Sequence, residues 1–106
     1  MAKFLIEASY TPEGLKGLQK DKASGRLEAV SKAAQSLGGA LESLHYALGQ
    51  YDVVLVVDLP DTGAAAAFAA AASGSGLVRT RTTALLTVAE MDQALGRSLE
   101  YRPPGR

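Results

Sequence analysis

The eight residues DVVLVVDL, from Asp52 to Leu59, constrain the fold more than any other stretch of this sequence. Val53 to Val57 are five consecutive aliphatic residues, and turn residues bound the run on both sides, Gly49 before it and Pro60-Asp61 after it. A short apolar run between turn residues predicts a strand. A strand that is apolar at every position must be covered on both faces, so we place it in the centre of a sheet.

Three further strands are expected around this one. They cover residues 3–10, 41–48 and 77–86, and the apolar run itself is the third of the four strands in chain order. Helices are expected between the first and second strands and between the third and fourth. The second of these helices spans residues 62 to about 72. The tail YRPPGR, residues 101–106, is expected to be extended because its prolines forbid a helix.

Capping residues mark where the helices begin and end. Thr11 is a good N-cap and Pro12 suits the first helical position, so a helix follows the first strand directly. The segment KDKASG, residues 20–25, interrupts this helix, which resumes and then ends at Gly38-Gly39. A capping box at residues 87–90 begins a last helix. We expect its apolar side chains to face inward; they are Val88, Met91 and Leu95.

The order β-α-β-β-α-β predicts an α+β, ferredoxin-like fold with an extra C-terminal helix. Right-handed crossovers give the strand order 4-1-3-2, with all neighbours antiparallel and the helices on one face. One domain over residues 1–100 and a tail over 101–106 are expected. The open face of the sheet would then expose an apolar patch on the order of several hundred Å², larger than monomers usually leave bare. We therefore expect a homodimer that packs through this face.

Composition excludes several classes of protein. The 11 acidic and 11 basic residues balance, so no overall charge would attract nucleic acid or an anionic membrane, and neither partner is expected. The chain has no cysteine, and its single histidine with scattered carboxylates matches no metal-ligand spacing. We expect no metal and no cofactor. No apolar run is long enough for a membrane span and the N-terminus does not read as a secretory signal, so a cytoplasmic location is expected.

Several short motifs together resemble those of one known family. They are ASYTPEG (8–14), SLGG (36–39), GQYDVV (49–54), DLPD (58–61), TTALLT (82–87) and YRPPG (101–105). In this order they are similar to the GYD-domain family of small bacterial proteins, within the dimeric α/β-barrel superfamily. The resemblance covers nearly the whole chain and implies the same ferredoxin-like fold and dimer. That family has no generally established activity, so the resemblance implies little about function.

The stretch for which the family is named, here Gly49, Tyr51 and Asp52, allows two interpretations. In a structural one, Gly49 adopts a backbone conformation that a Cβ would forbid, with a bulge. Tyr51 then lies across the edge of the sheet, and Asp52 accepts a hydrogen bond from a backbone N–H. In a functional one, Tyr51 and Asp52 stand at the mouth of a cleft and orient a ligand.

Two more polar residues stand where apolar ones are expected. Glu7 interrupts the first strand, and the neighbouring fourth strand is predicted to carry Arg79 and Arg81 on a common face. Glu7 forms either a cross-strand ion pair with one of these arginines, or part of a ligand pocket in which Glu7 or an arginine such as Arg81 meets the substrate. His45 is the only histidine, on the same side of its strand as Leu41 and Ser43. It is either a general base or a hydrogen-bonded surface group.

The second helix holds eight alanines and one large side chain, Phe68. Alanine lets a helix lie close to a sheet, which is the interpretation that we favour here, or leaves volume beneath the helix for a ligand. We expect a dimer that binds a small apolar molecule in a cleft between the sheet and the helices. The superfamily resemblance supplies one alternative, a cofactor-independent monooxygenase or isomerase in which His45 abstracts a proton and Tyr51 orients the substrate. A regulatory or structural oligomer subunit is a further alternative.

Overall fold

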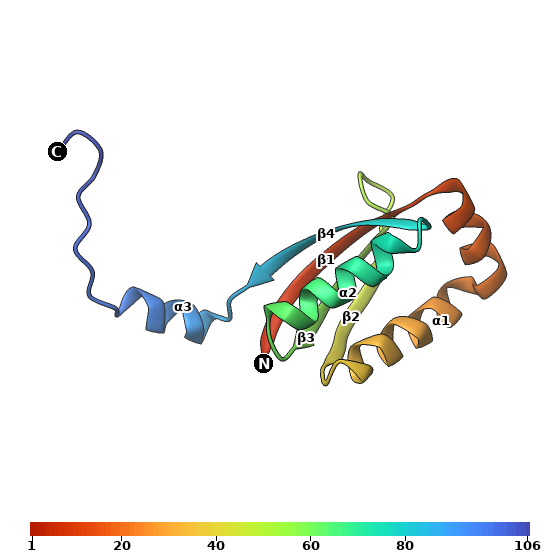
Figure 1. Ribbon diagram of the computed structural model, residues 1–106, viewed down its shortest axis with the longest axis horizontal. Helices are drawn as coiled ribbons and strands as arrows, with labels where there is room; N and C mark the ends of the chain where they lie inside the picture. The colour runs from red at the N-terminus through yellow and green to blue at the C-terminus, as the bar shows by residue number, and fades with distance from the viewer.

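A computed structural model describes all 106 residues. A four-stranded sheet carries two helices side by side on one face, and a third helix lies beyond the end of the sheet (Figure 1). The strand order is β2-β3-β1-β4 with every neighbour antiparallel, which confirms the predicted ferredoxin-like topology. The elements are β1 Ala2–Tyr10, α1 Pro12–Ser36, β2 Ala40–Tyr46, β3 Val53–Leu59, α2 Thr62–Gly74, β4 Val78–Leu85 and α3 Val88–Leu95.

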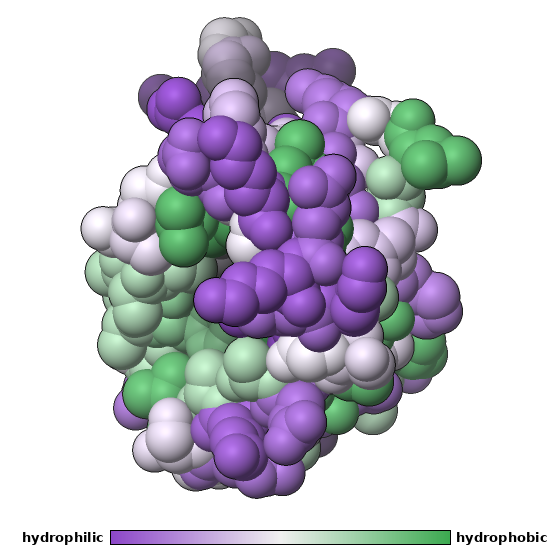
Figure 2. Space-filling model, turned by 90° about the vertical axis from the view of Figure 1, so that its right-hand side faces the viewer, coloured by the Kyte–Doolittle hydropathy of each residue, from purple (hydrophilic) through white to green (hydrophobic).

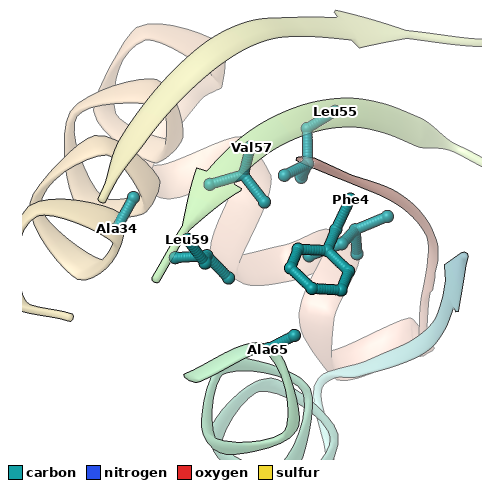
Figure 3. Close-up of a cluster of buried hydrophobic side chains, with 7 residues drawn as sticks. Phe4, Ala34, Leu55, Val57, Leu59 and Ala65 are labelled. Atoms are coloured by element: carbon teal, nitrogen blue, oxygen red, sulfur yellow. The ribbon is translucent and has the colours of Figure 1, made fainter. Parts of the chain in front are cut away.

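The hydrophobic core lies between the sheet and the helices α1 and α2. Alternate residues of β3 are buried against the helices, while Val54 and Val56 between them point to the other face and are half-buried. Phe4 of β1, Ala34 of α1 and Ala65 of α2 complete the same cluster (Figure 3). β3 is a central strand, with one face in this core and the other on the side of the sheet without helices. Both faces carry apolar side chains, and together they make up the unbroken apolar run in the sequence.

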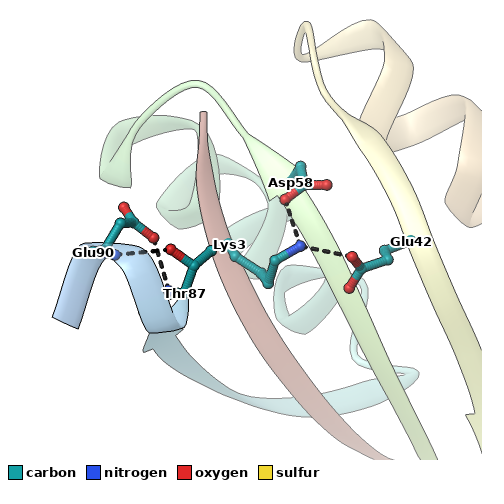
Figure 4. A network of polar contacts seen from close by, with 5 residues as sticks. All are labelled: Lys3, Glu42, Asp58, Thr87 and Glu90. Carbon is teal, nitrogen blue, oxygen red and sulfur yellow. Dashed lines mark hydrogen bonds and ion pairs between the residues drawn. The ribbon is translucent and has the colours of Figure 1, made fainter. Parts of the chain in front are cut away.

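That second side is called the open face from here on, because no helix packs on it. Strand alternation and pairing place on it residues 3, 5, 7 and 9 of β1, 43 and 45 of β2, 54, 56 and 58 of β3, and 79, 81, 83 and 85 of β4. At one end Lys3 donates to Glu42 at 2.8 Å and to Asp58 at 3.0 Å (Figure 4). These hydrogen bonds raise the pKa of the Lys3 ammonium and tie β1, β3 and β2 together.

Both helices of the helical layer begin as the sequence predicts. The Thr11 side chain accepts from the backbone N–H of Gly14 to cap α1, and Asp61 caps α2 in the same way. The start of α1 also lies hard against the loop before β4. A Cβ on Gly14 would collide with the backbone carbonyl of Leu77, so only glycine allows this close approach.

Helix α1 is bent where the sequence predicted an interruption. Lys22 has φ 65° and ψ 167°, a backbone conformation that is not helical and that is disfavoured for a residue with a Cβ. The bend divides α1 into two helical pieces, and α1 curves around the side of the sheet (Figure 1). None of the three helices combines the length and the apolar character that spanning a membrane requires.

The prediction that the apolar side of the last helix faces inward is wrong. Val88, Met91 and Leu95 are 82%, 45% and 70% exposed. The physical reason is the short connection: only two residues, 86 and 87, join β4 to α3. The helix therefore continues past the end of the sheet instead of turning back onto the helical layer (Figure 1).

The predictions about Gly49 and about the neighbours of His45 also need correction. Gly49 does not have positive φ, and a Cβ there would meet no atom within 4 Å, because the loop from β2 to β3 is long and open. The register shift lies instead between Leu41 and Ser43 of β2. It turns Leu41 toward the helices and leaves Ser43 and His45 on the open face, so Leu41 and His45 do not share a side.

Candidate functional site

The residues singled out in the sequence fall into one region of the open face. The register places His45 opposite Val54, Val54 opposite Glu7, and Glu7 opposite Arg81, in one row across all four strands. Tyr51 lies at the same end of the sheet, since the Arg81 Nη1 donates to its hydroxyl at 3.4 Å. The sheet register therefore brings together side chains that are far apart in the sequence.

Of the two arginines on β4, Arg81 lies opposite Glu7, but the two form no ion pair within 4.0 Å. The guanidinium hydrogen-bonds the Tyr51 phenol instead. This bond and the nearby Glu7 carboxylate raise the pKa of Arg81 above its usual value. Tyr51 thus lies across the end of the sheet and reaches the edge strand β4, as the structural interpretation of the loop requires.

Asp52 fastens the end of the β2–β3 loop to β1. Its carboxylate accepts from the backbone N–H of Tyr10 at 2.8 Å, and its own N–H donates to the carbonyl of Ala8 at 2.9 Å. Its carbonyl accepts from Ala47 at 2.8 Å. These three bonds give Asp52 a complete structural role at this corner.

His45 lies exposed on the edge strand β2, and its side chain makes no hydrogen bond within the chain. Nothing orients its ring, and the row from His45 to Arg81 lines neither the pocket between α1 and α2 nor the pocket beside the start of β4. No three side chains of histidine, cysteine, aspartate or glutamate come close enough to hold a metal ion. A catalytic role for His45, and ligand binding by Glu7, Tyr51, Asp52 and Arg81, stay predictions.

A groove lies elsewhere, between α1 and α2 on the covered face of the sheet. This groove has a volume of about 490 Å³, and 12 of its 18 lining residues are hydrophobic. They are Tyr10 of β1; Gly14, Gly17, Leu18, Asp21, Arg26, Ala29, Val30, Ala33, Ser36 and Leu37 of the first helix or its C-cap; Ala67, Phe68, Ala71 and Ala72 of α2; and Ser75, Leu77 and Val78 beyond it. Figure 2, viewed from the α1 side, shows green, hydrophobic surface bordering a hollow, with purple, hydrophilic surface beside it.

Two features of the sequence create this groove. The bend at Lys22 lets both pieces of α1 line it, Leu18 from the first and Val30 from the second. On the opposite wall, Ala67 and Ala71 of α2 present only methyl groups, so little side-chain volume fills the space between the helices. The sequence analysis singled out the alanines but none of the residues that α1 contributes, because the spacing of apolar residues does not predict the path of a bent helix.

Polar groups gather beside the bend. Arg26 Nη1 and Asp21 Oδ2 are 3.8 Å apart, a loose ion pair that leaves most of the guanidinium donors free. Tyr10 lines the groove next to them, and Tyr46 lies against Tyr10. Burial of its ring, with the neighbouring Tyr10 hydroxyl, raises the pKa of Tyr46 to about 12. The groove therefore offers a long apolar wall and a polar end near the middle of α1.

Comparison with known proteins bears on the family. A search of curated proteins and a search of solved structures found no match. The family model described as GYD domain matches residues 4–95, from β1 through the end of α3. That span contains all of the sheet except Ala2 and Lys3, all three helices and the Gly49-Tyr51-Asp52 loop, and it ends before the YRPPG motif at 101–105. On this match, and on a fold that agrees with it, the chain belongs to the GYD domain family.

Proposed function

We propose that the protein binds a small, mostly apolar molecule in the groove between α1 and α2. The observation that supports this most strongly is the size and character of the groove. Its volume of about 490 Å³ falls in the range of small-molecule sites, roughly 300–1,000 Å³. Such sites are typically apolar with a few polar groups that fix the orientation of the ligand. Phe68 and the alanine methyl groups of α2 supply the apolar surface, and Tyr10 and Arg26 supply the polar groups.

In this proposal the ligand binds in the groove and not at the row of polar side chains on the open face. A general base needs a substrate beside it and a surrounding that limits water, and His45 has neither within one chain. The geometry therefore favours the binding module over the monooxygenase or isomerase.

The groove can be tested with the fluorescent probe 1-anilinonaphthalene-8-sulfonate, displaced by 1-decanol. Ala71→Phe places a ring into the groove, whereas Ala70→Phe makes the same change at an exposed position outside it. We expect Ala71→Phe to weaken binding of both molecules by about tenfold or more, equivalent to about 1.4 kcal/mol. Ala70→Phe should bind like the unaltered protein, and thermal unfolding checks that both variants fold. Equal binding by all three proteins would contradict the proposal.

We also propose that two copies associate through the open face. Leu5, Val54 and Val56 form a half-buried apolar band in its centre, on the side that no helix covers. The substitutions Val54→Asp and Leu55→Asp separate this interface from the core, since Val54 points to the open face and Leu55 is 4% exposed in the core. Val54→Asp should give a folded monomer by sedimentation, and Leu55→Asp should unfold the chain. A folded dimer with Val54→Asp would refute the contact.

A further inference from the structure

The polar end of the groove between α1 and α2 indicates which class of molecule fits it. Among the 18 residues that line the groove, Arg26 is the only cation and Asp21 the only acid, and both lie beside the bend in α1. The rest of the lining on the second piece of α1 is apolar apart from Ser36, whose hydroxyl donates to the carbonyl of Ala33. The groove therefore has charged groups at one end only.

The apolar wall of α1 begins directly beside this charged end. One side of the second piece of α1 carries, at intervals of four, three and four residues, Arg26, Val30, Ala33 and Leu37. At the helical rise of 1.5 Å per residue, this row is about 16 Å long. A straight chain of ten carbon atoms is about 11 Å long when fully extended. Such a chain can lie along the wall with its head group at Arg26.

The Arg26 guanidinium is available to a ligand. Its Nη1 lies 3.8 Å from Asp21 Oδ2, which is longer than a hydrogen bond, and it makes no second ion pair. The side chain of Asp21 is 48% exposed and that of Arg26 is 36% exposed, so water reaches the carboxylate more easily than the guanidinium. A guanidinium has five N–H donors and no acceptor. A ligand with two acceptor oxygens would therefore satisfy donors that the chain leaves free.

Two phenols lie near Arg26 and can add a further donor. Tyr10 lines the groove, and Tyr46 lies against Tyr10. Burial of its ring raises the pKa of Tyr46 to about 12, and the neighbouring Tyr10 hydroxyl raises it too, while the positive charge of Arg26 opposes part of the rise. Tyr46 is thus neutral at physiological pH and can donate to the Tyr10 oxygen, which leaves Tyr10 able to donate its own hydrogen to a ligand.

We propose that the ligand of the groove is an apolar chain that ends in a single carboxylate, which Arg26 and Tyr10 bind. The chain lies along the α1 wall, past Val30 and Ala33. This inference rests on the proposed function and names the class of ligand for it. A guanidinium pairs with a carboxylate through two parallel hydrogen bonds, which an alcohol cannot accept in the same way. A doubly charged phosphate monoester fits less well, because a single arginine beside Asp21 supplies too little positive charge.

The first test compares decanoate with 1-decanol, which has the same alkyl chain, at about pH 8, where a carboxylic acid is ionised. Both Kd values come from alanine methyl shifts in NMR titrations. Arg26→Gln removes the cation from the groove, and Lys32→Gln is the matched control, since Lys32 is an exposed residue of the same helix outside the groove. We expect Arg26→Gln to raise the Kd of decanoate by about tenfold or more and to change that of 1-decanol less than about twofold. Lys32→Gln should leave both values unchanged.

A second variant should change the affinity in the opposite direction. Asp21→Asn removes the carboxylate that competes for Arg26, so the Kd of decanoate should fall by about threefold while that of 1-decanol stays the same. An unfolded protein cannot gain affinity, so this result does not depend on the stability of the variants. Intermolecular NOEs then locate the bound chain. We expect contacts from the C2 protons of decanoate to the Tyr10 ring and from its terminal methyl group to Ala33.

Three results would overturn the carboxylate assignment. They are decanoate binding that is as tight in Arg26→Gln as in Lys32→Gln, weaker decanoate binding in Asp21→Asn, and NOEs that place the carboxylate end at Ala33. The proposed function would survive each of them as long as Ala71→Phe weakens the binding of 1-decanol. If neither decanoate nor 1-decanol binds the unaltered protein, the proposed function is wrong and this inference is wrong with it.

Discussion

The strained residue at the bend of α1 allows a quantitative prediction. The φ of 65° and ψ of 167° at Lys22 fall in a region that is essentially restricted to glycine and costs other residues about 1–3 kcal/mol. Lys22→Gly removes that strain. Glycine also makes the unfolded chain more flexible, which costs about 0.5–1 kcal/mol. The net expectation is a stabilisation of about 1 kcal/mol, or about 4–8 °C in Tm for a domain near 100 residues.

The assay is thermal unfolding with Lys22→Ala as the control. Lys22 is exposed and makes no ion pair, so alanine removes only the solvent-facing part of the side chain while keeping the Cβ and the strain. Its Tm should stay close to that of the unaltered protein. Because glycine keeps the bend, binding of 1-anilinonaphthalene-8-sulfonate should also be unchanged in Lys22→Gly. A glycine variant no more stable than the alanine variant would show that the helix is not strained at this residue.

Three further predictions concern the surroundings of the groove. Gly14→Ala should destabilise the fold by about 1–3 kcal/mol, since its Cβ collides with the Leu77 carbonyl, while Gly17→Ala meets only open space and should be neutral or stabilising by up to about 1 kcal/mol. Chemical denaturation compares the two. The pKa of Tyr46, raised to about 12, favours the neutral phenol in the folded state, so its stabilising effect is complete below about pH 10 and is lost toward pH 12. Absorbance titration against Tyr46→Phe measures this, and ionisation near pH 10 would contradict it. Gly49→Ala should change stability by less than about 0.5 kcal/mol, and a larger loss would show that the loop is more constrained than its open geometry implies.

The fold was predictable because several levels of the sequence agree. The apolar run in β3 predicts a central strand, and Thr11-Pro12 predicts the start of α1. Gly49 was misjudged because glycine is compatible with many backbone conformations, and a loop of this length does not require positive φ. The apolar spacing of α3 correctly indicated an apolar side, but periodicity does not say whether the covering surface belongs to the same chain.

The candidate site, too, could be predicted from the sequence only in part. Glu7 was linked with an arginine of the fourth strand, but His45 was chosen separately, and the antiparallel register brought all three into one row. The sequence indicated only the α2 wall of the groove, and even there the alanines are compatible with close packing as well as with an open space. The separation of the two helices decides between these, and it depends on the bend at Lys22, a tertiary feature of α1.

The central claim, an apolar site in the groove, is tested most directly by alanine methyl NMR. Helix α2 carries its own controls: Ala67, Ala71 and Ala72 line the groove, whereas Ala66 and Ala70 face solvent. Titration of ¹³C-methyl-labelled protein with 1-decanol should shift the first three resonances in a saturable manner and leave the other two in place. Shifts confined to methyl groups outside the groove, or no saturable shift at any alanine, would contradict the account.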